Sequence, residues 1–280
     1  MITRTSLRRA LSRSLRWLLA VIAVAISVFP VLWMLRMSLS PADEAVLDGI
    51  QLLPSALDWG NYARAWERAD LSRAMLNGAL VTGSILVIQL ITVIPTGYAF
   101  AKVRFRGRNT AFAIVLACLL VPTQATALPL YLGVGSVGLA NTFAALVLPF
   151  MTSAIGIFML RQHMITIPDS LLEAAKADGL GTFRTLLHVV IPSSMPTIAA
   201  FAVLSIFTHW NDYLWPLLVA RNPSLYTPPL ALSMFQQAET GTAYGELAAA
   251  AVLVTLPIVV LFVVAQRKFV TGIAGGELPG

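Results

Sequence analysis

The feature that most constrains this chain is a series of long apolar blocks separated by short polar segments. Hydrophobic residues make up 58% of the sequence and charged residues only 11%, about half the charged share of an ordinary soluble domain. Each block is long enough to cross about 30 Å of hydrocarbon as a helix. The chain is therefore predicted to be an all-α, polytopic membrane protein.

Six of the apolar blocks are predicted to span the membrane. The resulting transmembrane domain, residues 17–265, lies between a basic N-terminus (1–16) and a C-terminal tail (266–280). The first apolar run is too long for the apolar region of a signal peptide, so an uncleaved first helix is expected. The predicted spans are Trp17–Leu35, Leu76–Ala101, Thr110–Leu132, Ala140–Leu160, Ser193–Ala220 and Gly245–Ala265.

The basic residues predict the orientation of these spans. Fourteen of the 19 gather in four clusters on the same side of the predicted membrane, which places both termini in the cytoplasm by the positive-inside rule. This distribution argues against a nucleic-acid partner, although the net charge is +6. The clusters fall within Arg4–Arg16, Lys102–Arg108, Arg161–Arg184 and Arg267–Lys268.

One predicted cytoplasmic loop, residues 168–192, carries the most specific pattern. Ser170 and Glu173 have the spacing of a capping box, which predicts the start of a helix. Gly179 and Gly181 allow a sharp turn with positive φ. A second short helix is expected next, capped by the hydroxyl of Thr182. Its apolar positions are Phe183, Leu186, Leu187 and Val190.

The outer face of the first helix in this loop is predicted to combine small and charged residues. The small side chains of Ala174 and Ala175 permit close approach of another chain, and charges beside them can fix the register of a partner. A helix that lies along the membrane surface is the alternative. The charged residues are Glu173, Lys176 and Asp178.

This loop resembles the EAA loop of ABC importer permeases. Glu173 is followed by two alanines, by Gly179 six residues later, and by Val189 and Pro192 where the family has isoleucine and proline. Further segments are similar, in order and topological place, to the MalG-like half of ABC carbohydrate importers, whereas the end of the chain departs from the family pattern. The similar segments include Gly97–Ala101, Val121–Gln124, Trp210–Leu217 and Gln266–Gly276.

The resemblance implies a non-catalytic permease subunit of an ATP-driven, binding-protein-dependent importer in the bacterial plasma (inner) membrane. The implied partners are a second permease subunit, two ATPase chains, an extracytoplasmic solute-binding protein and the lipid bilayer. No catalytic residue, cofactor or metal is expected in this chain, because ATP and Mg²⁺ would bind to the ATPase chains. By the resemblance, the residues that dock on the ATPase are Glu173, Ala174, Ala175, Lys176, Asp178, Gly179 and Arg184.

The implied solute is a sugar or sugar-like molecule, and two alternatives remain. A glycerol-phosphate-type solute would favour basic residues in the pathway. A stand-alone secondary transporter would need coupling charges within the spans, where Asp212 is the deeply placed carboxylate. Gly78 to Gly83 has the glycine spacing of a Walker A sequence, but Ser84 stands where lysine is required.

Polar and aromatic side chains within the spans are the candidates for the solute pathway. Intramembrane polar groups tend to face protein or a water-filled cavity, and sugars combine amide or carboxylate partners with aromatic rings. Interfacial belts of Trp and Tyr and hydrogen bonds between helices are the alternatives. The candidates are Asn77, Gln124, Tyr131, Trp210, Asn211, Asp212 and Trp215.

The long outward loop Arg221–Tyr244 is the candidate contact for the solute-binding protein. A simple re-entrant connection is the alternative. The residues singled out as the contact are Thr240, Gly241, Thr242 and Tyr244.

Overall fold

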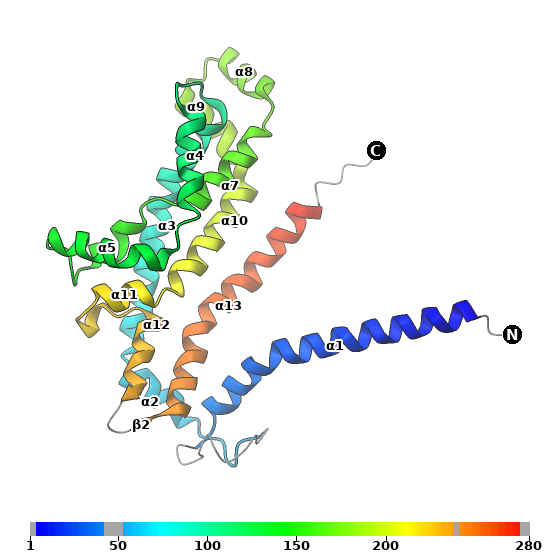
Figure 1. Ribbon diagram of the computed structural model, residues 1–280, viewed down its shortest axis with the longest axis vertical. Coiled ribbons are helices and arrows are strands. Elements are labelled where there is room, and N and C mark those ends of the chain that lie inside the picture. Colours follow the sequence, from blue (N-terminus) through cyan, green and yellow to red (C-terminus); the bar gives the residue numbers. More distant parts are fainter. Residues whose placement is uncertain (1–3, 42–52, 238–240, 275–280) are drawn as a thin grey trace. The chain divides into compact units, whose positions relative to one another are not determined.

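The computed structural model is almost entirely helical over the residues that it describes (Figure 1). These are residues 4–41, 53–237 and 241–274, with side chains for 14–41, 53–235 and 243–264. The chain divides into two compact units. The first comprises Met1–Ala69 and Leu232–Val254, and the second comprises Asp70–Ala231 and Thr255–Gly280.

The first unit contains two helices from the N-terminal part of the chain, a short strand pair and the beginning of the last helix. The strands are antiparallel, with Gln236 opposite Thr242. The basic N-terminus is helical from Arg4 and continues directly into the first span. The elements are α1 (Arg4–Ser38), α2 (Gly60–Arg68), η4 (Leu232–Phe235), β1 (Gln236–Gln237), β2 (Gly241–Thr242) and α13 (Tyr244–Ala274), which extends into the second unit.

The second unit is built around α3 (Leu71–Lys102), against which α7 (Ala154–Ile165) and α10 (Ile191–Trp210) pack. Glycine at 156 permits a close approach of α7 and α10, because an added Cβ there would lie 2.5 Å from the ring of Phe201. The remaining elements are α4 (Arg108–Cys118), α5 (Thr123–Ser136), α6 (Phe143–Val147), η1 (Leu148–Phe150), α8 (Asp169–Ala177), α9 (Thr182–Thr185), the π-helical segment η2 (Leu186–Val190), α11 (Leu214–Val219), η3 (Pro223–Leu225) and α12 (Pro228–Ala231).

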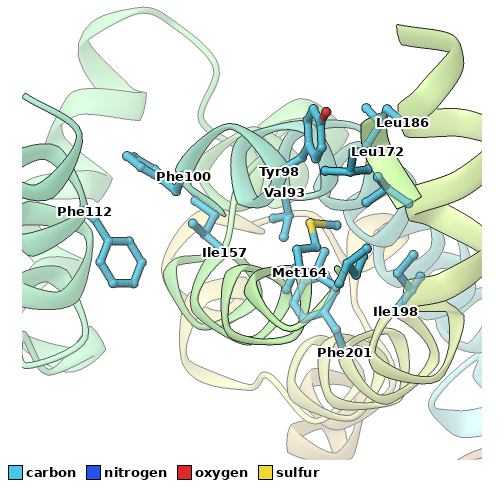
Figure 2. Packing of buried hydrophobic residues seen from close by; sticks show 13 residues of the cluster. Val93, Tyr98, Phe100, Phe112, Ile157, Met164, Leu172, Leu186, Ile198 and Phe201 are labelled. Atoms are coloured by element: carbon cyan, nitrogen blue, oxygen red, sulfur yellow. The ribbon is translucent and has the colours of Figure 1, made fainter. Parts of the chain in front are cut away.

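An apolar cluster forms the core of this second unit (Figure 2). Val93 of α3, Leu160 of α7 and Phe201 of α10 are almost completely buried in it. Figure 2 shows Leu172 and Leu186 at one edge of the cluster, beside Tyr98. The core therefore extends from the helices that cross the membrane to the segment that contains α8.

Five described helices are long and apolar enough to cross a membrane, and a bent pair makes a sixth crossing when it is counted as one span. The all-α, polytopic prediction is thereby confirmed, and the five helices overlap the first, second, fourth, fifth and sixth predicted spans. They are Ser14–Ser38, Leu71–Lys102, Phe143–Ile165, Thr182–Trp210 and Tyr244–Val264.

The third and fifth predicted spans were wrong in form. Instead of one helix over Thr110–Leu132, α4 and α5 meet at 98°, because the missing N–H of Pro122 and its clash with the preceding residue interrupt the helix. The predicted span Ser193–Ala220 ends as a helix at Trp210, and α11 follows separately.

Candidate functional site

The loop 168–192 forms two helices separated by a sharp turn, and α8 and α9 lie at one end of the second unit, away from α11 and α12 (Figure 1). The turn depends on Gly179, whose φ is +78°, a conformation that glycine adopts without steric cost. The helix–turn–helix prediction is therefore confirmed in outline. The second helix is not a separate short one, because α9 continues through η2 into α10.

The predicted caps of these helices were wrong. The N-cap of α8 is Pro168, which offers no side-chain hydrogen bond, and the helix already includes Ser170. The N-cap of α9 is Gly181, with φ of −69°, so Thr182 is the first helical residue rather than the cap. Of the two glycines in the turn, only Gly179 needs positive φ.

α8 has one buried face and one exposed face. Leu172 and Ala175 are 7% and 5% exposed, whereas Glu173, Ala174 and Ala177 are exposed. The predicted outward position of Ala175 was therefore wrong, because a residue three positions after the buried Leu172 lies on the same helix face. The small residues on the outer face are Ala174 and Ala177.

Apolar side chains remain exposed on both helices of the loop. Leu171 of α8 is 43% exposed, and Phe183 of α9 is 70% exposed. In the following segment, Leu186 and Val190 are buried, whereas Leu187 is 42% exposed. The other residues expected to dock, Lys176, Asp178, Gly179 and Arg184, are all exposed. This end of the unit therefore presents small, charged and apolar groups together.

Lys102, the last residue of α3, holds the beginning of α8 in place. Its Nζ donates to the carbonyl oxygens of Ile165 and Ile167 at 3.3 and 2.6 Å and to Oδ1 of Asp169 at 2.8 Å. The Lys102 side chain is only 11% exposed. Its hydrogen bond and charge hold the pKa of the Asp169 carboxyl below the ordinary value of 3.8. α8 is thus linked to α3 as well as to α7.

Several pathway candidates hold the backbone of neighbouring elements. The amide of Asn77 donates to the carbonyl oxygens of Ser224 and Tyr226, at 2.8 and 3.0 Å. The buried indole of Trp215 donates to the carbonyl oxygen of Ala145 at 2.9 Å.

The other pathway candidates lie on α5 and around the end of α10. On α5, Gln124 is exposed, and the hydroxyl of Tyr131 accepts a hydrogen bond from Arg221 at 2.8 Å. Trp210 is 7% exposed. The amide of Asn211 donates to the Phe207 carbonyl at 2.7 Å, and a carboxyl oxygen of Asp212 accepts from the backbone N–H of Trp215 at 3.2 Å. The structure thus brings Asp212 and Trp215 together.

A buried polar cluster on α3 and α10 was missed in the sequence. The amide nitrogen of Gln89, which is 2% exposed, donates to the carbonyl oxygen of Phe150 at 3.0 Å and lies 3.3 Å from Nε2 of His209. Ser205 donates to the Gln89 side-chain oxygen at 2.7 Å. The signal that could have found it is the glutamine itself, because an uncharged polar residue inside an apolar block needs partners.

The candidate contact for the solute-binding protein is described only in part. Thr240 lies outside the described residues. Gly241 and Thr242 form β2, of which the structure describes the backbone. Tyr244 begins α13 and is 51% exposed.

The chain is similar to known proteins over most of its length. Residues 93–274 match the family described as binding-protein-dependent transport system inner membrane component. The arabinooligosaccharides transport system permease protein AraQ of Halalkalibacterium halodurans is 33% identical over 280 residues, covering 98% of this chain and 100% of that protein. The sn-glycerol-3-phosphate transport system permease protein UgpE of Brucella suis is 32% identical, covering 96% and 99%. The lactose transport system permease protein LacG of Rhizobium radiobacter is 30% identical, covering 97% and 98%.

The fold is also found in a solved structure. A chain from the crystal structure of a bacterial ABC transporter involved in the import of the acidic polysaccharide alginate superimposes with a TM-score of 0.83 at 24% identity, covering 96% of this chain and 99% of that one. The family match covers more than half of the sequence, and the relatives align over nearly their whole lengths. This chain therefore belongs to the family of binding-protein-dependent transport system inner membrane components.

Proposed function

We propose that this chain forms half of the translocation pathway of an ATP-driven importer and docks on a separate ATPase chain through α8. The observation that carries this proposal is the outer face of α8, where small residues at 174 and 177 lie beside the exposed Glu173. Small side chains let another chain approach the helix closely, and the charge restricts which partner fits. The exposed ring of Phe183 adds apolar contact area at the same end.

The support beneath α8 suits it to transmit movement. Leu172 and Ala175 are buried on its inner face. Lys102 binds the Asp169 side chain at its first residue and the carbonyl oxygens of Ile165 and Ile167 just before it. Because interiors are close-packed, a push on the outer face displaces the attached helices instead of compressing the contact. α7 and α9 are joined to α8 along the chain, and Lys102 adds α3.

The end that carries α8 is proposed to face the cytoplasm. Basic residues gather there, with Lys102, Arg104 and Arg108 between the end of α3 and the start of α4 and with Lys176 and Arg184 in the loop 168–192. Such an excess of basic residues is typical of cytoplasmic segments. In this orientation, ATP binding by two partner ATPase chains draws the docked α8 inward. The spans then move from an inward-open to an outward-open arrangement, which receives solute from an external binding protein.

The proposed solute is a sugar or a sugar-like molecule. Relatives of this chain are named for the transport of arabinooligosaccharides and lactose. The amide and carboxylate side chains of Asn211 and Asp212, next to the aromatic rings at 210 and 213, offer the hydrogen-bonding and stacking groups that a sugar uses.

A glycerol-phosphate-type solute is the second candidate. A relative named for sn-glycerol-3-phosphate transport is 32% identical. Arg221 supports this candidate because its guanidinium, bound to the Tyr131 hydroxyl, could recognise a phosphate group. Equilibrium binding of both solute classes to the partner solute-binding protein decides between the two candidates.

Co-purification of the assembled importer tests the docking proposal. The chain would be expressed with its genomic neighbours as wild type and as the exposed-face variants Glu173→Arg and Ala174→Arg. We expect both variants to insert in the membrane and to lose the ATPase chains. Asn109→Arg is the matched control, because this exposed residue lies in the first turn of α4, outside α8, and it should retain them. Variants that keep the ATPase and transport normally, or a wild-type chain that transports alone in liposomes, would overturn the proposal.

A further inference from the structure

The polar face of α2 is bound to the ends of two membrane spans within the first unit. Asn61 is 1% exposed, and its amide donates to the carbonyl oxygens of Ser38 and Ser40, at 3.1 and 2.8 Å, where α1 ends. Gly245, at the start of α13, packs against the same side chain, because an added Cβ there would lie 2.8 Å from the Asn61 nitrogen. α2 therefore lies directly against the ends of both helices.

Ion pairs fix the same face of α2. Nε of Arg64 lies 3.2 Å from Oε1 of Glu246, and Nη1 of Arg68 lies 3.0 Å from Oε2 of the same carboxylate. Arg64 also pairs with Asp58 at 2.6 Å. Glu246 is only 16% exposed. The arginines of this short helix are thus bound to carboxylates within the unit.

The opposite edge of α2 is aromatic and exposed. Trp59, Ala63 and Trp66 are spaced by four and three residues, so they lie along one edge of the helix. Trp59 is 66% exposed and Trp66 is 43% exposed. Leu57, just before the helix, is 62% exposed. The helix therefore has its arginines on the face that packs and its tryptophans on the face that does not.

The contacts of α2 set its depth in the membrane. Ser38 ends the span Ser14–Ser38, and Glu246 lies in the first turn of the span Tyr244–Val264. A helix that touches both lies at the level where these spans leave the hydrocarbon. Tryptophan is enriched at this level, where its ring fits among phospholipid headgroups. A helix with one polar and one apolar face can lie in this plane.

We propose that α2 is an interfacial helix whose Trp59–Ala63–Trp66 edge lies among the phospholipid headgroups, held at that depth by Asn61 and Glu246. The ligand of this surface is the bilayer itself. The depth of the span ends favours lipid over a protein partner, because a docking protein approaches from the aqueous side.

Spin labels in nanodiscs test this placement. The full complex would carry Cys118→Ala, which removes the single cysteine of the chain, together with Ala63→Cys on the aromatic edge. Ser55→Cys, an exposed position in the segment before α2 and outside the aromatic edge, is the matched control. We expect the label at 63 to collide with oxygen and with a nickel-chelating lipid headgroup and to lose most of its collisions with a water-soluble nickel complex, relative to the label at 55.

Two results would overturn the proposal. Equal exposure of both labels to the water-soluble complex would mean that α2 stands clear of the bilayer. Shielding of position 63 only after the solute-binding protein is added would make this edge a protein contact instead. Both readouts are independent of ATPase docking through α8.

Discussion

The replacement Lys102→Met tests whether the link between α3 and α8 transmits movement. Methionine keeps much of the apolar stem and removes the amine, so packing changes little while three hydrogen bonds are lost. Lys102→Arg is the conservative comparison, because it keeps a donor and the charge. Arg106→Met is the matched control, since it removes one charge from an exposed position four residues later, between α3 and α4.

The size of the effect follows from the partners of the amine. A hydrogen bond from a charged group contributes about 1.5–3 kcal/mol. We count the hydrogen bond to the carbonyl oxygen of Ile167, which is 2.6 Å long and belongs to a buried residue. We do not count the bond to the Ile165 carbonyl oxygen, because water can replace the amine there. The bond to Asp169 is not counted, because its side chain is 77% exposed. A loss of about 1.5–3 kcal/mol should raise the population of displaced α8 roughly 13- to 160-fold.

Hydrogen exchange and coupled transport measure this effect in the assembled importer. In Lys102→Met, the amides of Leu171–Ala177 should exchange faster while those in the middle of α3 stay protected. The ATPase chains should remain bound, because Glu173 and Ala174 are untouched, but less solute should be transported per ATP hydrolysed. Lys102→Arg should restore much of the coupling. Unchanged exchange in α8, or unchanged coupling despite faster exchange, would refute the reasoning.

Three further outcomes are expected. Lys102 lowers the pKa of the Asp169 carboxyl below 3.8, so the contribution of this pair to the stability of α8 is complete above pH 3.8 and is lost as the pH falls through the lower folded value. The protection factors of the α8 amides, which remove the intrinsic pH dependence of exchange, should be constant from about pH 8 to 5 and fall only in stronger acid, and Lys102→Met should abolish that fall. Gly156→Ala places a Cβ 2.5 Å from Phe201 and should lower stability in detergent by about 1–3 kcal/mol. Gly133→Ala, with open space around it in α5, should not lower the melting temperature, because alanine favours a helix more than glycine does. Gln89→Leu removes the partner of Ser205 and of the Phe150 carbonyl and should lower the free energy of unfolding by about 0.6–2 kcal/mol. A double-mutant cycle with Ser205→Ala in thermal unfolding should give a coupling energy between the two residues. Strict additivity of the two substitutions would contradict the hydrogen bond.

Features that depend only on residues close together in the sequence could be predicted from it. The length of each apolar block determines that it can cross the membrane as a helix, and this requires no partner. The turn after α8 follows from Gly179, because a positive φ is a property of one residue. The EAA spacing lies within a single loop, so the position of α8 was predictable as well.

Which face each helix buries was decided by the tertiary structure. Ala174 and Ala175 are adjacent residues of the same type, and the packing of the α8 face that carries Leu172 buries Ala175 and leaves Ala174 exposed. The pairing of Lys102 with Asp169 joins positions 67 residues apart, and that of Gln89 with His209 joins positions 120 apart. The 98° bend between α4 and α5 also depends on tertiary packing. A proline in the sequence permits a break, but the packing of the two halves sets its direction, because side-chain contacts between distant segments determine how a chain folds back on itself.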